Sequence, residues 1–406
     1  MPFRALNPNC NKKRPVTSTG RRRVNPFDHS ATRLKYNEAI RRTNEEELLL
    51  RLVRTRYQDS SVSLAVSNVT TQFETVAGAN YLNGTDAGDP TDLFTGSLGV
   101  ADRPTIVLTP GGANYFEEIG TQLTLEQLEF IAGNFAIGSV LRLFVSNING
   151  LDNASTAEGP APPCPPEFEE FRYVAELATE LQDRRGIHLT RQKKIEDEEY
   201  VLRNTSVEGF LALKQAGFEV SQAESGEQLI VKEPTITPIL SLRVEPDTLD
   251  VCSEFQHMLG LDPKLNSYKF NTVPEQFPGS PMGSEKQGVN ITTRSLVQAS
   301  LLLSQGVEVP DCHIECGLVR TTRNPDGSLF DWNQVLGNLF HVSCCKRKPK
   351  NARVAVKFRG YWFFIADCDK DSVETLLLFN TAQKLQGIRT TGRNVDAPVL
   401  TISAGR

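Results

Sequence analysis

The clearest pattern of apolar and polar positions lies between Tyr36 and Phe73. In its first half, apolar residues recur at intervals of three and four, which predicts one buried face of a helix. The residues of that face are Leu48, Leu49, Leu52, Val53 and Tyr57. Thr43 and Glu46 have the spacing of a capping box, and Asn44 with Glu47 repeats it. The helix is therefore predicted to begin near these residues.

Three arginines of the same segment fall mostly outside the apolar face. They are Arg51, Arg54 and Arg56. Pairs of opposite charge three or four residues apart are common on exposed helix surfaces. The arginines therefore predict a solvated basic face that pairs with the glutamates preceding it.

A strand is predicted after this helix. Asp59 and the two serines that follow break the helical pattern, and residues 62–66 then alternate between apolar and small or polar positions. The alternation changes phase after Ser67-Asn68, because the next apolar residues fall on the opposite parity. A β-bulge or a break in the strand at this point explains the change.

The rest of the chain continues with helix and strand patterns. Thr124 and Gln127 form a further capping-box pair. Apolar residues keep the helical period from Ile137 to Ile148, and Asn149-Gly150 supplies a left-handed cap to end that helix. Further predictions are helices at 167–185, 293–305 and after Asp371, strands at 218–220, 228–231 and 239–244, a long loop at 262–290, a hairpin at 354–365 and an edge strand at 399–402.

These elements predict an α+β fold with two mixed helix-strand domains. Residues 152–166 (DNASTAEGPAPPCPP) are rich in proline and are the predicted linker. The predicted N-terminal domain covers residues 31–151 and the predicted C-terminal domain covers residues 167–406. Residues 1–30 lack periodicity and are predicted to form a disordered basic arm.

Composition places the chain among ordinary globular proteins. It has 406 residues, of which 39% are hydrophobic and 23% charged. No stretch approaches the run of ~20 apolar residues that a membrane span needs. The first residues, MPFRALNPNCNKKRP, lack the apolar core of a signal peptide. The expected location is therefore the cytoplasm as the sequence is written, or the cell envelope if the true start lies upstream.

Charge is distributed unevenly along the chain. Residues 1–42 contain 11 Lys or Arg and 2 acidic residues, whereas the chain as a whole has a net charge of −5. Such an arm could bind nucleic acid or an anionic surface, or it could be a solvating tail. No aromatic residues interleave the clusters, so base stacking has no support there. The candidate binding residues are Lys12, Lys13, Arg14, Arg21, Arg22 and Arg23.

One cluster resembles a metal or thiol site. Thiolates and imidazoles are the ligands that a tetrahedral zinc site uses. The candidate ligands are Cys312, Cys316, His341 and Cys344, with His313 and Cys345 nearby in the sequence. Their spacing departs from the usual zinc knuckles, so free or buried thiols are the alternative and no cofactor is expected. The eight cysteines do not form a compact disulfide framework.

Carboxylates near the C-terminus provide the other chemical hypothesis. Asp367, Asp369 and Asp371 resemble the start of a calcium loop, but Ser372 and Leu378 occupy the positions where an EF-hand needs Gly and Glu. Capping of a helix by Asp369 or Asp371 is therefore the preferred interpretation. An enzyme of unrecognised type could use Asp331, Asp367 and Asp369. The common catalytic motifs HExxH, GxSxG and the P-loop are absent from the sequence.

The segment NEEELLLRLVRTRYQD followed by an apolar strand resembles an uncharacterised bacterial protein family. The resemblance extends through LRLFVSNINGLDNAS, PEFEEFRYVAELATELQ, RSLVQASLLLSQGVEVP, FDWNQVLGNLF and RVAVKFRGYWFFIADCD. It implies a bacterial protein, and some members look like envelope lipoproteins, from which this chain departs by lacking a signal. The resemblance assigns no activity to any residue. The first hypothesis is therefore a non-catalytic binding or assembly protein, with the carboxylate enzyme and the thiol or zinc module as alternatives.

Overall fold

The computed structural model divides the chain into two compact units. Unit 1 takes its residues from Met1–Asp59 and Gly120–Gln386, and unit 2 from Ser60–Ile119 and Gly387–Arg406. The structure describes residues 29–59, 64–82, 93–110, 119–203, 209–211, 214, 219–222, 228–272, 288–390 and 400–403. The predicted N-terminal arm lies outside the described residues, apart from the start of the first helix.

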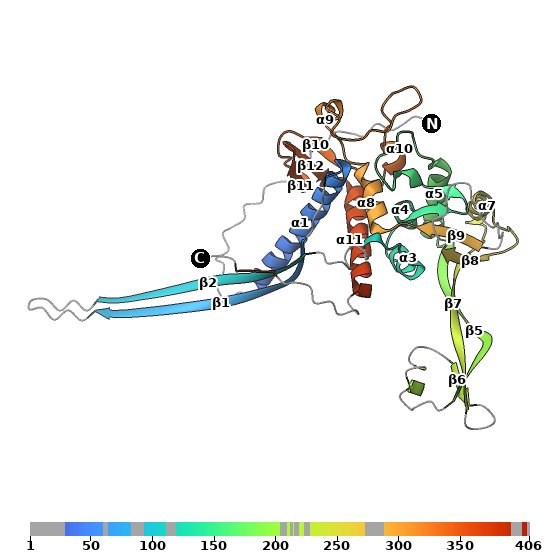
Figure 1. The fold of residues 1–406 in the computed structure, drawn as a ribbon, viewed down its shortest axis with the longest axis horizontal. Helices are drawn as coiled ribbons and strands as arrows, with labels where there is room; N and C mark the ends of the chain where they lie inside the picture. Colours follow the sequence, from blue (N-terminus) through green and yellow to red (C-terminus); the bar gives the residue numbers. More distant parts are fainter. Residues whose placement is uncertain are drawn as a thin grey trace, which may run out of the picture. The chain divides into compact units, whose positions relative to one another are not determined.

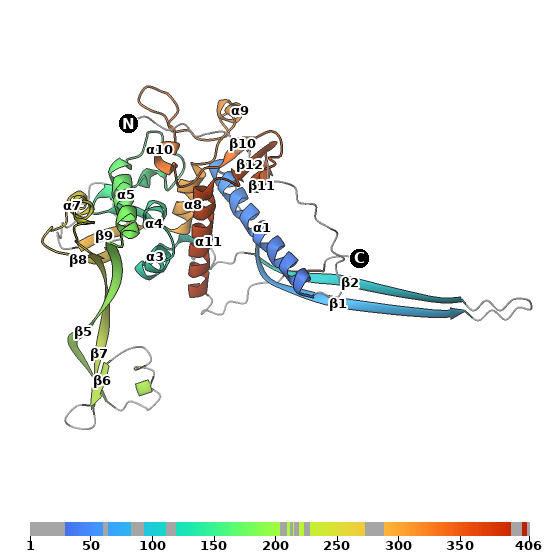
Figure 2. The same ribbon diagram turned by 180° about the vertical axis from the view of Figure 1, so that it is seen from behind.

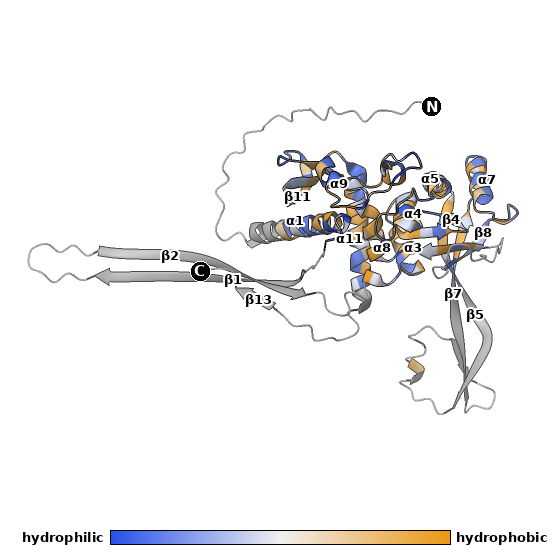
Figure 3. Cartoon of the chain, turned by 45° about the horizontal axis from the view of Figure 1, so that its top comes forward, coloured by the Kyte–Doolittle hydropathy of each residue, from blue (hydrophilic) through white to orange (hydrophobic). Residues whose placement is uncertain are grey.

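Unit 1 combines helices with two sheets, so the predicted α+β class is confirmed (Figure 1). Its helices are α1 (His29–Arg56), α3 (Leu125–Ala132), α4 (Ile137–Phe144), α5 (Glu169–Asp183), α7 (Leu249–Met258), α8 (Leu296–Ser304), α9 (Asp311–Glu315), α10 (Asn333–Leu336) and α11 (Lys370–Thr390). Figure 3 shows hydrophobic residues gathered along α8, inside the group of helices. The core of unit 1 is shared, with buried residues on the helices and on the strands of both sheets.

The larger sheet of unit 1 has seven strands in the order β4-β3-β9-β8-β7-β5, with β6 paired to β7. All pairings are antiparallel except the one between β8 and β9. Its strands are β3 (Val145–Ile148), β4 (Leu151–Asp152), β5 (Ile187–Arg203), β6 (Glu219–Gln222), β7 (Gln228–Leu242), β8 (Ser267–Thr272) and β9 (Gly288–Thr293). The predicted loop at 262–290 was wrong where β8 covers residues 267–272 and where β9 covers residues 288–290.

The smaller sheet has the order β10-β12-β11. Its strands are β10 (Ser343–Cys345), β11 (Ala352–Phe358) and β12 (Tyr361–Ala366). The predicted hairpin is confirmed, because β11 and β12 pair through the turn Arg359-Gly360, whose φ angles are 45° and 87°. A left-handed pair of turn residues matches the twist of a two-residue hairpin and suits the glycine.

Helix α1 buries the predicted apolar face against α8 and the smaller sheet. Its start was predicted wrongly, since the helix already runs through Thr43 and Asn44. Glutamates beyond that point pair with arginines of the same helix, as in Arg42–Glu46 at 2.9 Å, and these pairs fit a continuous helix better than a cap. The solvated basic face also needs correction, because Arg56 is only 9% exposed.

The capping box predicted at the start of α3 is present, with Thr124 and Gln127 bonded in both directions. The single helix predicted from Ile137 to Ile148 is not observed. Helix α4 ends at Phe144, and Val145–Ile148 pairs with β9 as strand β3. A β-branched residue at Val145 and the neighbouring strand favour this change. Asn149 and Gly150 do have positive φ, but they form the turn between β3 and β4.

The boundaries between the two compact units do not fall at the predicted linker. Residues 152–166 lie inside unit 1. The segment is held at both ends, by Ala154 N–H donating to Glu167 O and by Thr322 Oγ1 donating to Pro162 O at 2.7 Å. Glu158 forms an ion pair of 2.6 Å with the fully buried Arg294. Proline-rich composition therefore marks an irregular packed segment here.

Two long ribbons complete the fold. In unit 1, β5 and β7 continue beyond the strand β8, which pairs with β7 only at residues 239–241 (Figure 1 and Figure 2). The described strands of unit 2 are β1 (Leu64–Leu82), β2 (Leu93–Pro110) and β13 (Leu400–Ser403). The predicted bulge is confirmed, because the register of β1 against β2 shifts between Val66 and Asn68. The predicted edge strand is also confirmed as β13.

Candidate functional site

A pocket of about 170 Å³ with apolar walls and several polar side chains lies in unit 1 where α1 ends, beside the segment that follows α8. It brings together residues from four distant parts of the chain. The polar side chains in its lining include Arg56, Gln305, Glu308, Asp331, Trp332 and His341. Two of these, Asp331 and His341, were candidates from the sequence.

Local structure explains how these side chains meet. Arg56 is the last residue of α1, so it lies one turn beyond the buried Leu52 and on the same side of the helix. Val307 and Val342 form a parallel bridge, and Glu308 N–H donates to Val342 O at 2.9 Å. This bridge sets the side chain of Glu308 beside that of His341.

Glu308 and His341 form an ion pair, with Oε1 and Nε2 at 3.0 Å. The hydrogen bond to Glu308 raises the pKa of His341, although burial acts in the opposite direction. Burial would raise the pKa of Glu308, but the bonds from His341 and from Cys344 N–H together hold it below its ordinary value. Both side chains are about 40% exposed, at 37% and 44%, so solvent screens this pair.

We expect this pair to give unit 1 a defined pH dependence. The raised pKa of His341 means that its stabilising contribution is full below the ordinary value of 6.5 and is lost as pH rises through the folded pKa. The lowered pKa of Glu308 means that its contribution is full above 4.5 and is lost as pH falls through its folded pKa. Both contributions to the stability of unit 1 are at their full value only between pH 4.5 and pH 6.5.

Titration of the imidazole followed by NMR tests this expectation, with His341→Asn used to assign the signal. The pKa of His341 should lie above 6.5 and should fall in Glu308→Gln, because burial then acts without the carboxylate. Glu245→Gln is the matched control, since this carboxylate is bound to Arg243 and not to a histidine. An unchanged His341 pKa in Glu308→Gln contradicts the proposed cause.

Three buried polar atoms of the pocket residues have no hydrogen-bond partner within the described part of the chain. They are Arg56 Nε, Gln305 Oε1 and Trp332 Nε1. Burial lowers the pKa of Arg56 to about 10, and its Nη1 donates to Arg320 O at 3.0 Å. Unpaired buried polar groups cost free energy, and their concentration around one pocket marks it as the candidate binding site of unit 1.

The cysteine and histidine candidates are neighbours, but their side chains contact different groups. His313 Nδ1 and Tyr57 Oη are 2.7 Å apart, Cys312 Sγ and Tyr361 Oη are 3.3 Å apart, and Cys345 Sγ donates to Arg347 O. Across the described ranges, no group of three or more His, Cys, Asp or Glu side chains is placed to hold a metal ion. The cysteines within those ranges, including Cys316, are free thiols.

The pKa of Cys344 is raised to about 11 by burial and by the nearby charge of Glu308. The neutral thiol is therefore favoured near neutral pH, whereas the thiolate is the nucleophile and the metal ligand. The geometry gives the thiol or zinc hypothesis no support.

Two of the three candidate carboxylates, those of Asp331 and Asp369, serve local structure. Asp331 Oδ1 accepts from Asn333 N–H at 3.0 Å in the turn before α10. Asp369 caps α11, accepting from the backbone N–H and the hydroxyl of Ser372, as the capping interpretation predicted. Asp367 is exposed and does not line the pocket. Only Asp331 of the three reaches the candidate site.

Sequence reasoning missed Arg56, Gln305, Glu308 and Trp332 as members of a shared site. A signal did exist for Arg56, because it follows Leu52 by four residues and Val53 by three. No comparable signal exists for Gln305 or Trp332, which meet Arg56 only through the tertiary fold. The basic residues from Lys12 to Arg23 lie outside the described residues.

Comparison with protein-family models, with curated proteins and with solved structures finds no significant match to this chain. The resemblance to a bacterial family therefore stays a prediction. Among the described helices, none combines the length and the apolar composition that crossing a bilayer requires.

Proposed function

We propose that this protein is a non-catalytic binding or assembly protein that engages a protein partner through its long β-ribbons. The partner is either another copy of the chain or a second protein. The family resemblance suggests a bacterial cell as the setting, with the cell envelope as one location. The observation that carries the proposal is the length of the β1–β2 ribbon in unit 2.

Strands β1 and β2 have 19 and 18 residues and pair from Leu64↔Pro110 to Leu82↔Leu93. A strand of this length extends roughly 60 Å, whereas strands of globular proteins usually have about 5–6 residues. Only β13 adds to this pair within the described residues, and it covers four residues of β2. A two-stranded ribbon has little of its own to bury its faces, so a partner surface would complete it.

The β5–β7 ribbon of unit 1 has the same character. Its pairing extends from Ile187↔Leu242 to Arg203↔Gln228, with a register shift between Ile195 and Glu199. Exposed strand edges present unpaired N–H and C=O groups that another chain can use. The engagement of Asp331 and Asp369 in turns and caps favours binding over catalysis for this protein.

Shortening the β1–β2 ribbon should abolish assembly while leaving unit 1 folded. The variant removes residues 76–99 and joins the paired residues Thr75 and Val100 through Asn-Gly, a sequence that favours two-residue hairpins. The matched control removes residues 83–92 and joins Leu82 to Leu93 in the same way, so that every strand residue is retained.

Light scattering gives the molar mass of each form alone, and gentle purification from the native cells shows whether a defined partner remains bound. We expect the full chain and the control to form a complex and the shortened variant to remain monomeric. Circular dichroism and thermal melting check that the body still folds. A full chain that is monomeric without any partner, or a shortened form that still assembles, would contradict the proposal.

A further inference from the structure

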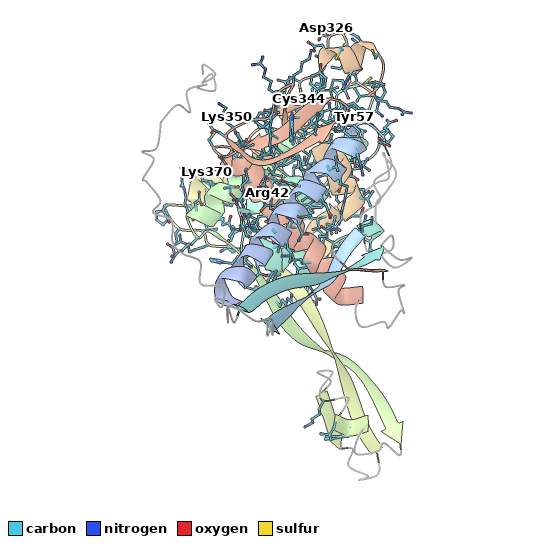
Figure 4. The ribbon with its side chains drawn as sticks, turned by 90° about the vertical axis from the view of Figure 1, so that its left-hand side faces the viewer. Arg42, Tyr57, Asp326, Cys344, Lys350 and Lys370 are labelled. Carbon is cyan, nitrogen blue, oxygen red and sulfur yellow. The ribbon has the colours of Figure 1, made fainter. Side chains whose placement is uncertain are left out.

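A groove of about 600 Å³ runs between α1 and β11 in unit 1. One wall is a largely polar side of α1, including Thr43, Glu46 and Glu47, and the opposite wall is β11 from Ala352 to Lys357. The loop Lys348–Lys350 closes one end. In Figure 4, Arg42 lies on α1 and Lys350 lies by the smaller sheet.

Strand β11 is at the edge of its sheet, because the strand order is β10-β12-β11. The pair Phe358↔Tyr361 closes a two-residue hairpin, and such a closing pair exchanges both backbone hydrogen bonds. Bonded and non-bonded pairs then alternate along the strands, so the backbone groups of Ala355 and Lys357 point away from β12. In the described chain no further strand lies on that side.

The same strand lies in a strongly basic part of the chain. Residues 346–359 contain seven Lys or Arg and no acidic residue, although the whole chain has a net charge of −5. Arg353 is paired with Glu45 at 3.1 Å, and Lys348 lies over the ring of Trp362 at 5.2 Å. Lys350 and Lys357 are exposed. The groove is therefore positively charged along β11.

The two faces of β11 differ in character. Val354 and Val356 are buried on the face toward α1, whereas Lys357 is exposed on the opposite face. Arg353 lies at the shift of register in β11 and reaches Glu45 of α1. Side chains of an added strand would alternate between the same two faces. Glu46 and Glu47 of α1 would repel acidic residues on the inner face, so a fitting segment has apolar residues inward and acidic residues outward.

We propose that this groove binds an extended acidic segment of a partner protein, which adds to β11 as a fourth strand of the smaller sheet. Backbone hydrogen bonds to Ala355 and Lys357 would hold the segment, and the lysines of the groove would select its acidic residues. The site is separate from the β-ribbons and does not depend on the function proposed for them.

Fluorescence anisotropy with the full-length protein tests the proposal. The probe is a capped, labelled heptapeptide that alternates Glu and Val. A second peptide with the same side chains carries N-methyl groups on the amides of one edge, so it keeps the charge but loses backbone donors. A third probe, labelled oligothymidylate, reports whether the basic surface simply binds any polyanion.

We expect saturable binding of the alternating peptide and a loss of about tenfold or more on N-methylation. Ala355→Pro should cause a similar loss, because proline removes an outward N–H and leaves the pairing with β12 in place. The double change Lys350→Glu with Lys357→Glu should also weaken binding, and it keeps the test valid if the proline variant misfolds. Lys264→Glu, at an exposed position outside the groove, is the charge control.

Amide hydrogen exchange provides an independent readout, with slower exchange expected at Ala355 and Lys357 when the peptide is bound. Equal binding of the N-methylated peptide would overturn the proposal, as would binding of oligothymidylate without the peptide. If neither probe binds, the lysines only protect an edge strand from pairing, which is a known role of such residues, and the proposal is wrong.

Discussion

Replacing Arg294 with methionine should destabilise unit 1 by about 3–5 kcal/mol, the cost of breaking one side of a buried ion pair. The Arg294 side chain is fully buried, and its Nε donates to Glu158 Oε1 at 2.6 Å. Its Nη1 reaches the carbonyl oxygens of Arg142, Leu143 and Val145, and its Nη2 donates to Asn153 O. The substitution would leave a buried carboxylate and several carbonyl groups without this donor.

Urea denaturation followed by circular dichroism measures the loss. Arg294→Lys keeps the charge but lacks the planar fork, so it should recover only part of the stability. The double variant Arg294→Met with Glu158→Leu should be more stable than Arg294→Met alone, because it leaves no unpaired charge. A loss below about 1 kcal/mol in Arg294→Met would show that the ion pair does not hold the 152–166 segment in place.

The second large effect is expected at the centre of α1. Leu52→Ala should cost about 2–5 kcal/mol, since the deleted atoms lose their burial and leave a cavity. The Leu52 side chain is 0% exposed, as are Leu49 and Val53 beside it. The face they form packs against α8 and the smaller sheet, so little space is available for the surroundings to collapse.

Leu377→Ala is the matched control, because Leu377 is also a helical leucine but is 58% exposed. Its substitution should change the free energy of unfolding by less than about 0.5 kcal/mol. Similar losses for the two variants would mean that α1 is not part of the cooperative core. Thermal and urea unfolding of both proteins in the same buffer provide the comparison.

Local signals in the sequence predicted much of the secondary structure. The capping box at Thr124, the bulge or break near Ser67-Asn68 and the hairpin at 354–365 were all predicted from residues within a few positions of one another. Each depends on a short-range contact or on a backbone preference. Such features survive in almost any tertiary setting, so the sequence is sufficient to predict them.

Predictions that relied on periodicity alone were less secure. Residues 145–148 continue the helical period of α4, yet they pair with the distant strand β9, as in Val145↔Thr293, whose residues are 148 positions apart. The capping-box spacing at Thr43 occurs inside a continuous helix. In both cases a distant partner or neighbouring ion pairs outweighed a local preference worth less than about 1 kcal/mol.

The candidate sites show the same division. The sequence marked His341 and Asp331 as chemical residues, and both line the pocket. It grouped His341 with cysteines whose thiols bond elsewhere, and Asp331 with two carboxylates that do not line the pocket. The pocket residues Arg56, Gln305 and Trp332 are separated by up to 276 positions and could not be grouped from spacing. The edge position of β11 likewise depends on the order of strands in the sheet.

By itself, the sequence determined the α+β class, the buried face of α1 and the principal turns and caps, because these follow from apolar periodicity and short-range hydrogen bonding. The tertiary structure alone decided that residues 152–166 pack around Arg294, that Arg56 reaches a pocket shared with Gln305 and Trp332, and that β11 faces a basic groove. These features depend on contacts between residues far apart in the chain, whose energies appear only when several elements pack together.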